Sequence, residues 1–297
     1  MRLRNDALKR IVFIVNPASG VFSKENLGEI IRSRLDALRY EPEIMLTEGP
    51  GHATEICKEE IKRGTEVVVA VGGDGSVNEV ARGITGSELA MGIVPAGSGN
   101  GLAHHLKIPI SRKNAIDVIN QGKIIKIDTG MVNDRLFVSI AGIGFDGLIA
   151  KRFEHSKLRG FVGYLRVVAE EYTSYKPRKY RLEFNGQVVK TRALFIAFAN
   201  SDQFGFNTSI APGAKIDDGL LDVVIVDKPQ IIDLPILASL LYWRKIEQSK
   251  YITTIRTRDL KIITRSKRWV NIDGEPDRMG GNVTVGIRPL SLNVMVP

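Results

Sequence analysis

The residues best suited to chemistry lie in a glycine loop in the first third of the chain. Gly72-Gly73-Asp74-Gly75 follows the apolar run 67–71, and Ser76 and Glu79 come next, at the spacing of a helix capping box. Glycines leave room for a ligand beside the backbone, and the N-terminus of a helix binds anions, most often phosphate. Asp74 would repel a phosphate unless it binds Mg²⁺ or accepts a proton from a hydroxyl group. The loop therefore predicts phosphoryl transfer, and a plain strand-to-helix turn is the alternative.

Three further segments carry polar residues at or near the end of an apolar run. Asn16-Pro17-Ala18-Ser19-Gly20 follows the run 11–15, and Pro95-Ala96-Gly97-Ser98-Gly99-Asn100 follows the run 91–94. Ligands of open α/β sheets bind at the carboxyl ends of the strands, where both loops are expected. Asp273-Gly274-Glu275 places two carboxylates around a glycine, although Asp-Gly is also a common turn.

The apolar periodicity predicts two domains of different architecture. In the first part of the chain short apolar runs alternate with helical patterns, an order typical of an α/β domain with a parallel sheet. The predicted strands are 11–15, 43–47, 67–71 and 91–94, and the predicted helices are 26–38, 52–63 and one that begins at about Ser76. From about residue 128 strand-like runs dominate, apart from helices near 164–171 and 232–249, which favours a β-sandwich. We place the domain boundary near residue 130, which gives domains at 1–130 and 131–297.

Composition excludes several classes of protein. The 297 residues include one cysteine, Cys57, so no intramolecular disulfide can form, and the N-terminal residues contain no apolar signal-peptide core. The stretch 231–243 contains Asp233 and Pro235 and is too short to span a bilayer. The histidines show no metal-ligand spacing, which argues against a zinc site. We therefore expect a cytoplasmic globular protein.

The formal charge of +9 is unevenly distributed. The segment 151–181 holds nine basic residues against three acidic ones, a net charge of +6, and a second basic cluster spans 256–268. Such clusters bind nucleic acid or anionic lipid, or are simply solvated surfaces. In the first cluster aromatic and aliphatic residues lie between the basic ones, a mixture that can enter a membrane interface.

Four motifs, in their order along the chain, resemble the catalytic domain of diacylglycerol kinases. They are Asn16–Gly20, the Gly72–Gly75 loop with Asn78 and Glu79, residues 95–100, and Asp273-Gly274-Glu275. Bacterial lipid kinases belong to this family, sphingosine kinases are relatives, and NAD kinases and phosphofructokinases are more distant ones. The resemblance implies a parallel-sheet α/β domain of the NAD kinase and diacylglycerol kinase type, followed by a mainly β sandwich that accepts lipid. It also implies an ATP-dependent lipid kinase that uses Mg²⁺, with ATP in a cleft between the domains.

The resemblance assigns roles to individual residues. It implies nucleotide binding by Asn16, Pro17, Ala18, Ser19, Gly20, Thr47, Gly72, Gly73, Asp74, Gly75, Ser76, Val77, Asn78 and Ser98. It implies that the general base is Asp74, Asp273 or Glu275, without deciding which, and that Asp146 contacts the acceptor, although Asp146 can equally be a turn residue. A structural Mg²⁺ is implied at the backbones of Lys215 and Leu220 and the side chain of Asp218, and Asp217 is a further candidate. After Asn100 the family has an acidic and an aromatic residue, whereas this chain has Gly101-Leu102-Ala103-His104-His105.

A lone G-x-G-x-x-G match at residues 142–147 is weak evidence for a dinucleotide site. We expect no helix-then-strand unit after it, and therefore interpret it as a coincidence.

The expected acceptor is a hydroxyl group of a lipid such as diacylglycerol, reached by peripheral association with an anionic membrane through the segment 151–181. We expect no nucleic acid partner. The sequence allows a homodimer but does not predict one. One alternative is a kinase of a soluble acceptor, such as NAD. The other is a catalytically inactive regulator that binds a nucleotide or nucleic acid.

Overall fold

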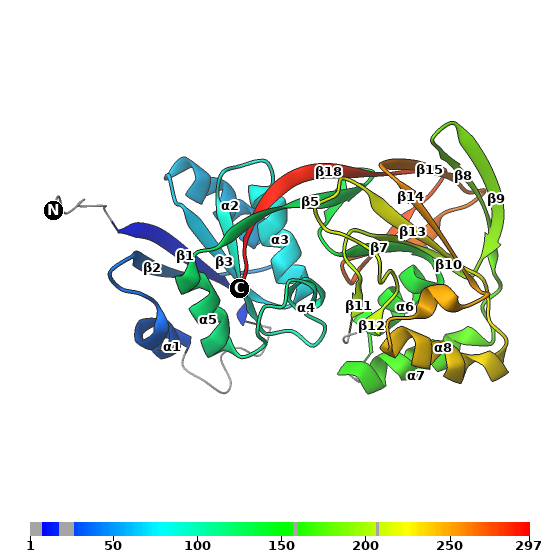
Figure 1. Cartoon of the computed structure of the whole chain (residues 1–297), viewed down its shortest axis with the longest axis horizontal. Coiled ribbons are helices and arrows are strands. Elements are labelled where there is room, and N and C mark those ends of the chain that lie inside the picture. The colour runs from blue at the N-terminus through cyan, green and yellow to red at the C-terminus, as the bar shows by residue number, and fades with distance from the viewer. Residues whose placement is uncertain (1–7, 18–26, 157–159, 206–207) are drawn as a thin grey trace. The chain divides into compact units, whose positions relative to one another are not determined.

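Two units, each with its own core, make up the part of the chain that the computed structural model describes, which is residues 8–17, 27–156, 160–205 and 208–297 (Figure 1). The first unit consists of Met1–Gly97, Leu106–Lys126 and Ser291–Pro297, and the second of Ser98–His105 and Ile127–Leu290. The chain thus leaves the first unit near the predicted boundary at residue 130. We predicted two continuous ranges, but neither unit is one, because the short segment 98–105 belongs to the second unit and the segment 291–297 belongs to the first.

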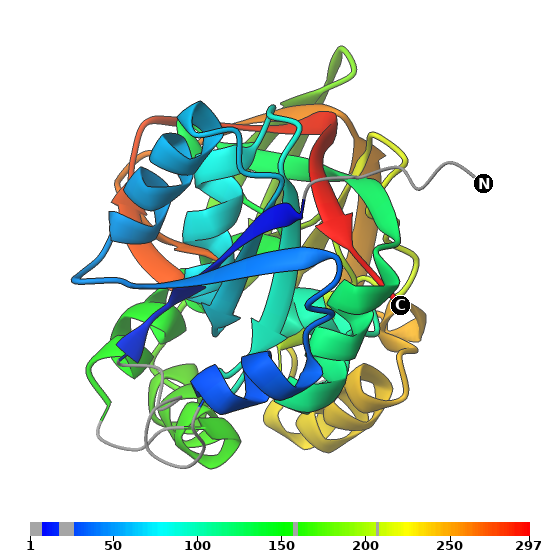
Figure 2. The same ribbon diagram turned by 90° about the vertical axis from the view of Figure 1, so that its left-hand side faces the viewer.

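The first unit is the predicted α/β domain with a parallel sheet. Its parallel strands lie in the order β2 (Tyr40–Leu46), β1 (Lys9–Val15), β3 (Val67–Gly72) and β4 (Ala90–Pro95). Figure 2 shows α2 (His52–Lys62) and α3 (Asp74–Ile84) on one face and α1 (Leu27–Arg34) and α5 (Arg112–Gln121) on the other. All residues of β3 and β4 are buried, as expected for apolar strands that are covered on both faces.

The second unit contains the predicted β-sandwich. One antiparallel sheet has the order β14 (Ile252–Thr257), β13 (Leu221–Val226), β10 (Phe195–Ala199), β7 (Ile140–Gly144), β16 (Arg268–Ile272) and β17 (Glu275–Met279). The other contains β9 (Gln187–Ala193), β8 (Arg178–Phe184), β15 (Asp259–Ile263), β18 (Asn282–Met295), β5 (Ile124–Val132) and β6 (Arg135–Phe137). A core that includes Phe137, Leu182, Phe198 and Ile262 takes side chains from both sheets. A two-stranded ribbon joins β11 (Gln203–Gly205) to β12 (Thr208–Ser209).

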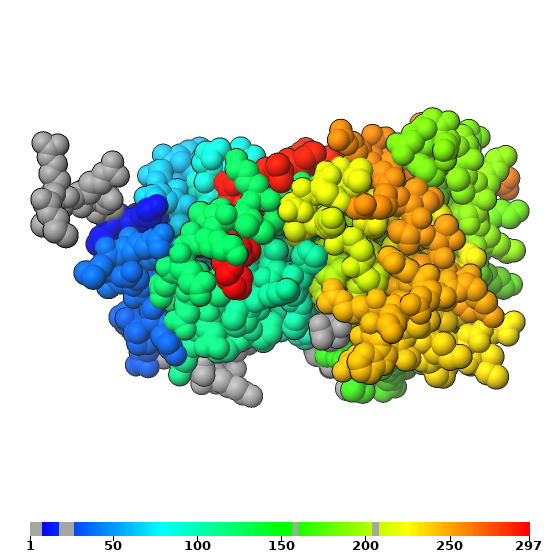
Figure 3. All heavy atoms as spheres, viewed as in Figure 1, coloured from blue at the N-terminus to red at the C-terminus, as the bar shows by residue number. Residues whose placement is uncertain are grey.

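Helices cover the outer face of the first of these sheets. They are α6 (Phe145–Glu154), α7 (Gly160–Tyr172) and α8 (Leu234–Tyr242), with the short helices η3 (Ile231–Asp233) and η4 (Ile246–Gln248) on either side of α8. Phe145, Ile149, Val167 and Tyr172 belong to the core that these helices form with β10 and β13. In the space-filling view of Figure 3 the segment that contains α8, coloured gold, forms the lower surface of this unit. A further helix, α4 (Gly101–His105), belongs to the same unit.

Two local predictions are wrong. Helix α3 begins at Asp74 and its N-cap is Gly73, so Ser76 and Glu79 do not form a capping box. The carboxylate of Glu79 instead accepts a hydrogen bond of 3.3 Å from the backbone N–H of Ala53 in α2. The helix predicted at 232–249 is interrupted, because α8 ends at Tyr242. Among the helices that the structure describes, none is both long enough and apolar enough to cross a bilayer.

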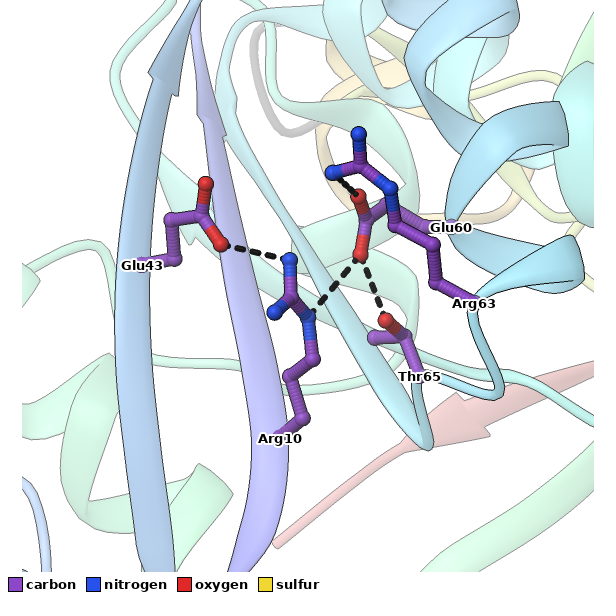
Figure 4. A network of polar contacts seen from close by, with 5 residues as sticks. All are labelled: Arg10, Glu43, Glu60, Arg63 and Thr65. Carbon is purple, nitrogen blue, oxygen red and sulfur yellow. Dashed lines mark hydrogen bonds and ion pairs between the residues drawn. The ribbon is translucent and has the colours of Figure 1, made fainter.

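A polar network holds the amino ends of the first sheet together (Figure 4). Glu60, whose side chain is fully buried, accepts hydrogen bonds from Arg10 Nε at 3.2 Å, Thr65 Oγ1 at 2.5 Å and Arg63 Nη1 at 2.9 Å, and Arg10 also contacts Glu43 at 2.5 Å. Burial would raise the pKa of Glu60, but the hydrogen bonds from Thr65 and Arg10 lower it below its usual value. This charged cluster is a structural tie between α2, β1 and β2, and it lies at the opposite end of the strands from the glycine loops.

Candidate active site

Backbone hydrogen bonds bring the predicted nucleotide loops of the first unit to one edge of its sheet. The N–H of Asn16 donates to the carbonyl of Val71 at 3.3 Å, and the N–H of Ala96 donates to the carbonyl of Gly72 at 2.8 Å. The N–H of Thr47 donates to the last residue of β1 at 2.9 Å. The carboxyl ends of four parallel strands therefore meet here, as expected for a ligand site of an open α/β sheet.

The N-terminus of α3 opens onto this edge. The first hydrogen bond within the helix runs from the N–H of Val77 to the carbonyl of Gly73 at 3.1 Å. The N–H groups of Gly75 and Ser76 precede that bond and have no partner within the helix. Asp74 and Ser76 are half-buried, so both remain accessible from solvent. Together with the helix dipole these groups can hold an anion beside the Asp74 carboxylate.

The other predicted nucleotide residues are distributed as follows. Ala18, Ser19 and Gly20 lie outside the described residues. The side chains of Val77 and Asn78 are buried, with exposed fractions of 5% and 3%, so they support the loop from inside the unit. Ser98 is exposed and belongs to the second unit.

Two glycines allow the loops to pack closely. A Cβ atom on Gly72 would lie 2.2 Å from the Ser76 Oγ, and one on Gly73 would lie 3.1 Å from the Gly97 Cα. The φ angle of Gly73 is −91°, which any residue can adopt. Gly73 is therefore required by the contact between two loops, and not by its backbone conformation.

The substitution Gly73→Asp is expected to abolish measurable ATP binding, because the new side chain would displace the Gly97 backbone and place a second carboxylate beside the helix N-terminus. Titration calorimetry with ATP measures the affinity. Gly49→Asp is the matched control, since a Cβ atom on Gly49 meets nothing within 4 Å. Unchanged ATP affinity in Gly73→Asp would place the nucleotide elsewhere.

In the second unit the carboxylate of Asp273 is fully engaged. It accepts three backbone hydrogen bonds, from Val138 at 2.7 Å, Ser139 at 2.9 Å and Ile140 at 3.0 Å. Asp273 has a φ angle of +47° and is 8% exposed. The three N–H donors thus bind both oxygens of the carboxylate. Asp273 therefore fixes the connection between β6 and β7, a role that suits a positioning residue better than a base.

Glu275 is held by an arginine that the sequence patterns did not identify. Arg135 Nη2 lies 3.2 Å from Glu275 Oε2, and Arg135 Nη1 lies 3.1 Å from Asp277 Oδ2. The side chain of Glu275 is 41% exposed. The guanidinium of Arg135 therefore bridges the carboxylates of Glu275 and Asp277 on β17.

Asn271 links the predicted acceptor residue to the acidic block. Its Nδ2 donates to Asp146 Oδ2 at 3.0 Å, and its Oδ1 accepts from the Gly274 N–H at 2.8 Å. Burial raises the pKa of Asp146 to about 6, against the lowering effect of the hydrogen bond from Asn271. The one signal for Asn271 in the sequence is its position two residues before Asp273, which lies in the turn after β16.

The raised pKa of Asp146 makes stability depend on pH. The folded-state value of about 6 lies above the ordinary 3.8, so the protonated form stabilises the fold below about pH 4, and this stability is lost as the pH rises through 6. The loss amounts to about 3 kcal/mol. Asp146→Asn cannot ionise and should therefore gain stability over the wild type between about pH 4 and pH 7, which urea unfolding measures. A constant difference between the two proteins would contradict this.

The acidic turn predicted to bind Mg²⁺ is closed by an arginine. Asp218 Oδ1 accepts from the Leu220 N–H at 3.1 Å, and Asp218 Oδ2 contacts Arg256 Nη2. Arg256 Nε also lies 3.3 Å from Asp222, whose Oδ2 has no hydrogen-bond partner among the described residues. The donor types suit a hard cation, but both oxygens of Asp218 are occupied. The arrangement fits a turn clamp, and the Mg²⁺ site at Lys215, Asp218 and Leu220 stays a prediction.

The segment that departs from the family pattern makes a polar contact of its own. His105 Nδ1 contacts the buried Asp202, which also pairs with Arg244. Burial, followed by the nearby Arg244, lowers the pKa of His105 to about 4, so the ring is neutral at physiological pH. This contact attaches α4 to the loop after β10 within the second unit.

The G-x-G-x-x-G match is explained by packing. A Cβ atom on Gly142 would lie 2.3 Å from Asp146 Oδ2, and one on Gly147 would lie 2.3 Å from the backbone of Trp269. Gly144 has a φ angle of +111°, which favours glycine. Gly142 and Gly147 thus allow α6 to lie close to the sheet, and Gly144 provides the turn into that helix. Contrary to the expectation from the sequence, a helix, α6, begins within the match and continues beyond it.

The chain resembles known proteins over almost its whole length. Residues 10–132 match the family described as "Diacylglycerol kinase catalytic domain", and residues 139–296 match "YegS C-terminal NAD kinase beta sandwich-like domain". A protein named diacylglycerol kinase from Staphylococcus aureus is 32% identical over 279 residues, which cover 90% of this chain and 86% of that protein. One of the same name from Staphylococcus saprophyticus is 28% identical over 274 residues, which cover 90% of this chain and 89% of that protein.

Solved structures support the fold. The crystal structure of a diacylglycerol kinase from Bacillus anthracis has a TM-score of 0.75 at 19% identity and covers 97% of both chains. A second structure from the same organism has a TM-score of 0.79 at 22% identity, again with 97% of both chains covered. The α/β unit with a parallel sheet and the antiparallel sandwich are thus confirmed.

Proposed function

Because the chain belongs to the diacylglycerol kinase family and is thus a phosphotransferase that acts on an alcohol group, we propose that it transfers phosphate from ATP to a hydroxyl group of a lipid such as diacylglycerol. The observation that carries this proposal is the N-terminus of α3, where N–H groups and the Asp74 carboxylate lie together at the carboxyl edge of a parallel sheet. Backbone groups from Asn16 and from Gly72 to Ser76 would hold the phosphates. Mg²⁺ bound with ATP would neutralise charge on the transferred group.

We assign proton transfer or metal binding to Asp74. The position of Asp74 supports this choice, because among the three candidate bases it is the one in the first turn of α3, beside the N–H groups that would hold the phosphates. We further propose that Asp273 is a positioning residue and that Asp146, which is held by Asn271, contacts the acceptor. The placement of ATP between the two domains stays a prediction.

Exchange of amide hydrogens tests the nucleotide site. ATP with Mg²⁺ is expected to slow exchange in peptides that cover residues 67–84, because bound phosphate would occupy the N–H groups at the start of α3. Peptides from β13 and β14 serve as the internal control and should not change. Protection confined to the second unit would contradict the assignment.

The lipid acceptor implies a cytoplasmic enzyme that associates peripherally with the membrane. The basic segment 151–181 gives this only partial support, because several of its charges are paired. Lys151 lies 2.9 Å from Glu154, Arg152 lies 2.8 Å from Glu171, and Arg166 lies 2.7 Å from Glu170. Lys157 and Arg159 lie outside the described residues. Preference for an anionic membrane, the absence of a nucleic acid partner and a homodimer all stay predictions.

A kinase of a soluble acceptor is the second candidate. It is favoured by the match of residues 139–296 to a domain described as "NAD kinase beta sandwich-like". An inactive regulator that binds a nucleotide or nucleic acid is the remaining alternative. Phosphate transfer to a panel of acceptors separates these three functions.

A further inference from the structure

Helix α8 presents an uncharged surface to solvent, and the turn before it adds Ile231 and Ile232, while Asp233 of that turn contacts Tyr251 and Lys250. None of the residues 234–242 is charged, and none of them is buried. Ile232 is 79% exposed, Ile236 is 61% exposed and Trp243, directly after the helix, is 68% exposed. Large apolar side chains gathered in this way on a soluble protein mark an interaction surface.

The first turn of α7 carries side chains of the same kind. Phe161, Val162 and Leu165 are exposed. The inner faces of α7 and α8 pack on the same core, and Figures 1 and 2 both show these helices along the lower side of the second unit. The end of α7 and the short helix η3 that precedes α8 also line one open groove of about 450 Å³, through Tyr172, Ile231 and Ile232. We call the exposed large apolar residues of these two helices and their flanking turns the apolar face. They are Phe161, Val162, Leu165, Ile231, Ile232, Ile236, Tyr242 and Trp243.

The order of residues along this segment suits a bilayer. Isoleucine and leucine residues are followed by Tyr242 and Trp243, and then by the exposed Lys245, while Arg244 between them pairs with the buried Asp202. Tyrosine and tryptophan concentrate at the boundary between acyl chains and water, and basic side chains reach from that boundary to the head groups. The ends of α8 therefore match the polarity gradient of a lipid surface.

We propose that the apolar face inserts into the acyl and head-group boundary of a bilayer and so holds the enzyme at the surface that contains its acceptor. This inference rests on the proposed function and identifies the surface that meets the lipid. Basic residues of the neighbouring α6 and α7 are paired with acidic ones. The transfer of apolar side chains from water to the bilayer therefore provides most of the free energy of membrane binding. This expectation differs from the preference for an anionic membrane that the charge of the segment 151–181 predicts. Binding through the apolar face should depend little on salt or on anionic lipid, since screening weakens only electrostatic attraction.

Tryptophan fluorescence tests the insertion directly. The chain has two tryptophans, so Trp269→Phe leaves Trp243 as the single reporter. Vesicles of phosphatidylcholine, with and without phosphatidylglycerol, are added at low and at high salt. The emission of Trp243 is expected to shift to shorter wavelength in all four conditions and to be quenched by brominated lipid. Sedimentation of the wild-type chain with the same vesicles gives the affinity independently of this variant.

Matched variants identify the surface. Ile232→Ser combined with Ile236→Ser should weaken vesicle binding by at least about tenfold, because each side chain loses its transfer from water. Leu38→Ser combined with Val188→Ser removes similar apolar area at exposed sites elsewhere and should leave binding unchanged. Lys151→Gln combined with Arg152→Gln should change binding by less than about twofold.

Three results would overturn the proposal. They are vesicle binding without a change in Trp243 emission, absence of vesicle binding, and self-association in the ultracentrifuge that the isoleucine variant abolishes while its vesicle binding persists. The last result would assign the apolar face to a second copy of the chain. Activity on a short-chain soluble diacylglycerol separates the two claims, because it tests the kinase function without requiring a bilayer.

Discussion

The substitution Asp74→Asn is expected to lower kcat by about a thousandfold, while the affinity for ATP and the melting temperature change little. Asparagine nearly preserves the shape of the side chain but can neither accept a proton nor bind a metal as a carboxylate does. Asp74 lies in the first turn of α3, where loss of a negative charge costs about 0.3–1 kcal/mol of helix stability. Steady-state kinetics with ATP and a dispersed lipid acceptor, together with thermal unfolding, measure both effects.

A second substitution of the same kind, away from the glycine loops, controls for the loss of a carboxylate as such. Asp117→Asn neutralises an exposed carboxylate of α5, in the same unit but away from the glycine loops. It should leave kcat unchanged. A kcat of the wild-type size in Asp74→Asn would remove this residue from the chemistry and leave Glu275 as the better candidate base.

The substitution Asp273→Asn is expected to reduce the free energy of unfolding by about 2–4 kcal/mol, because hydrogen bonds to a charged group each contribute about 1.5–3 kcal/mol. Asparagine keeps one acceptor oxygen but turns an NH₂ group toward the N–H donors of the β6 to β7 connection. It also tolerates the φ angle of +47°, so backbone strain does not contribute. Urea unfolding measures the change, and activity should fall with stability.

The neighbouring Asp277→Asn provides the comparison. Asp277 contacts Arg135 from a half-exposed position, and such a pair contributes at most about 1 kcal/mol. If Asp273→Asn instead abolished turnover with unfolding unchanged, Asp273 would be the general base and not a clamp.

The buried strands of the first unit could be predicted because their apolar runs are short, rich in β-branched residues and ended by glycines or polar turns. The start of α3 could not, because the capping box is a local pattern and a tertiary contact overrides it: Glu79 bonds to Ala53 in α2. Helix α6 was missed because its first residues lie within a run of glycines. One of them, Gly147, is required by packing against Trp269, which lies far away in the sequence.

The candidate site was only partly predictable for the same reason. Local sequence identified Asp74 and its loop, since every group involved lies within a few residues. The engagement of Asp273 by Val138, Ser139 and Ile140, and that of Glu275 by Arg135, depend on how the sandwich folds. The pairing of Arg166 with Glu170, in contrast, could be predicted from their spacing of four residues on a helix. This pairing lowers the effective charge of the basic segment.

Transfer of radiolabelled phosphate from ATP to a panel of acceptors tests the central claim most directly. The panel contains diacylglycerol, phosphatidylglycerol, sphingoid bases and NAD, each assayed with Mg²⁺ and with the wild-type and Asp74→Asn proteins. We predict label in at least one lipid, none in NAD, and loss of the lipid product in Asp74→Asn. Label in NAD alone, or in none of the acceptors, would contradict the assignment of this chain as a lipid kinase.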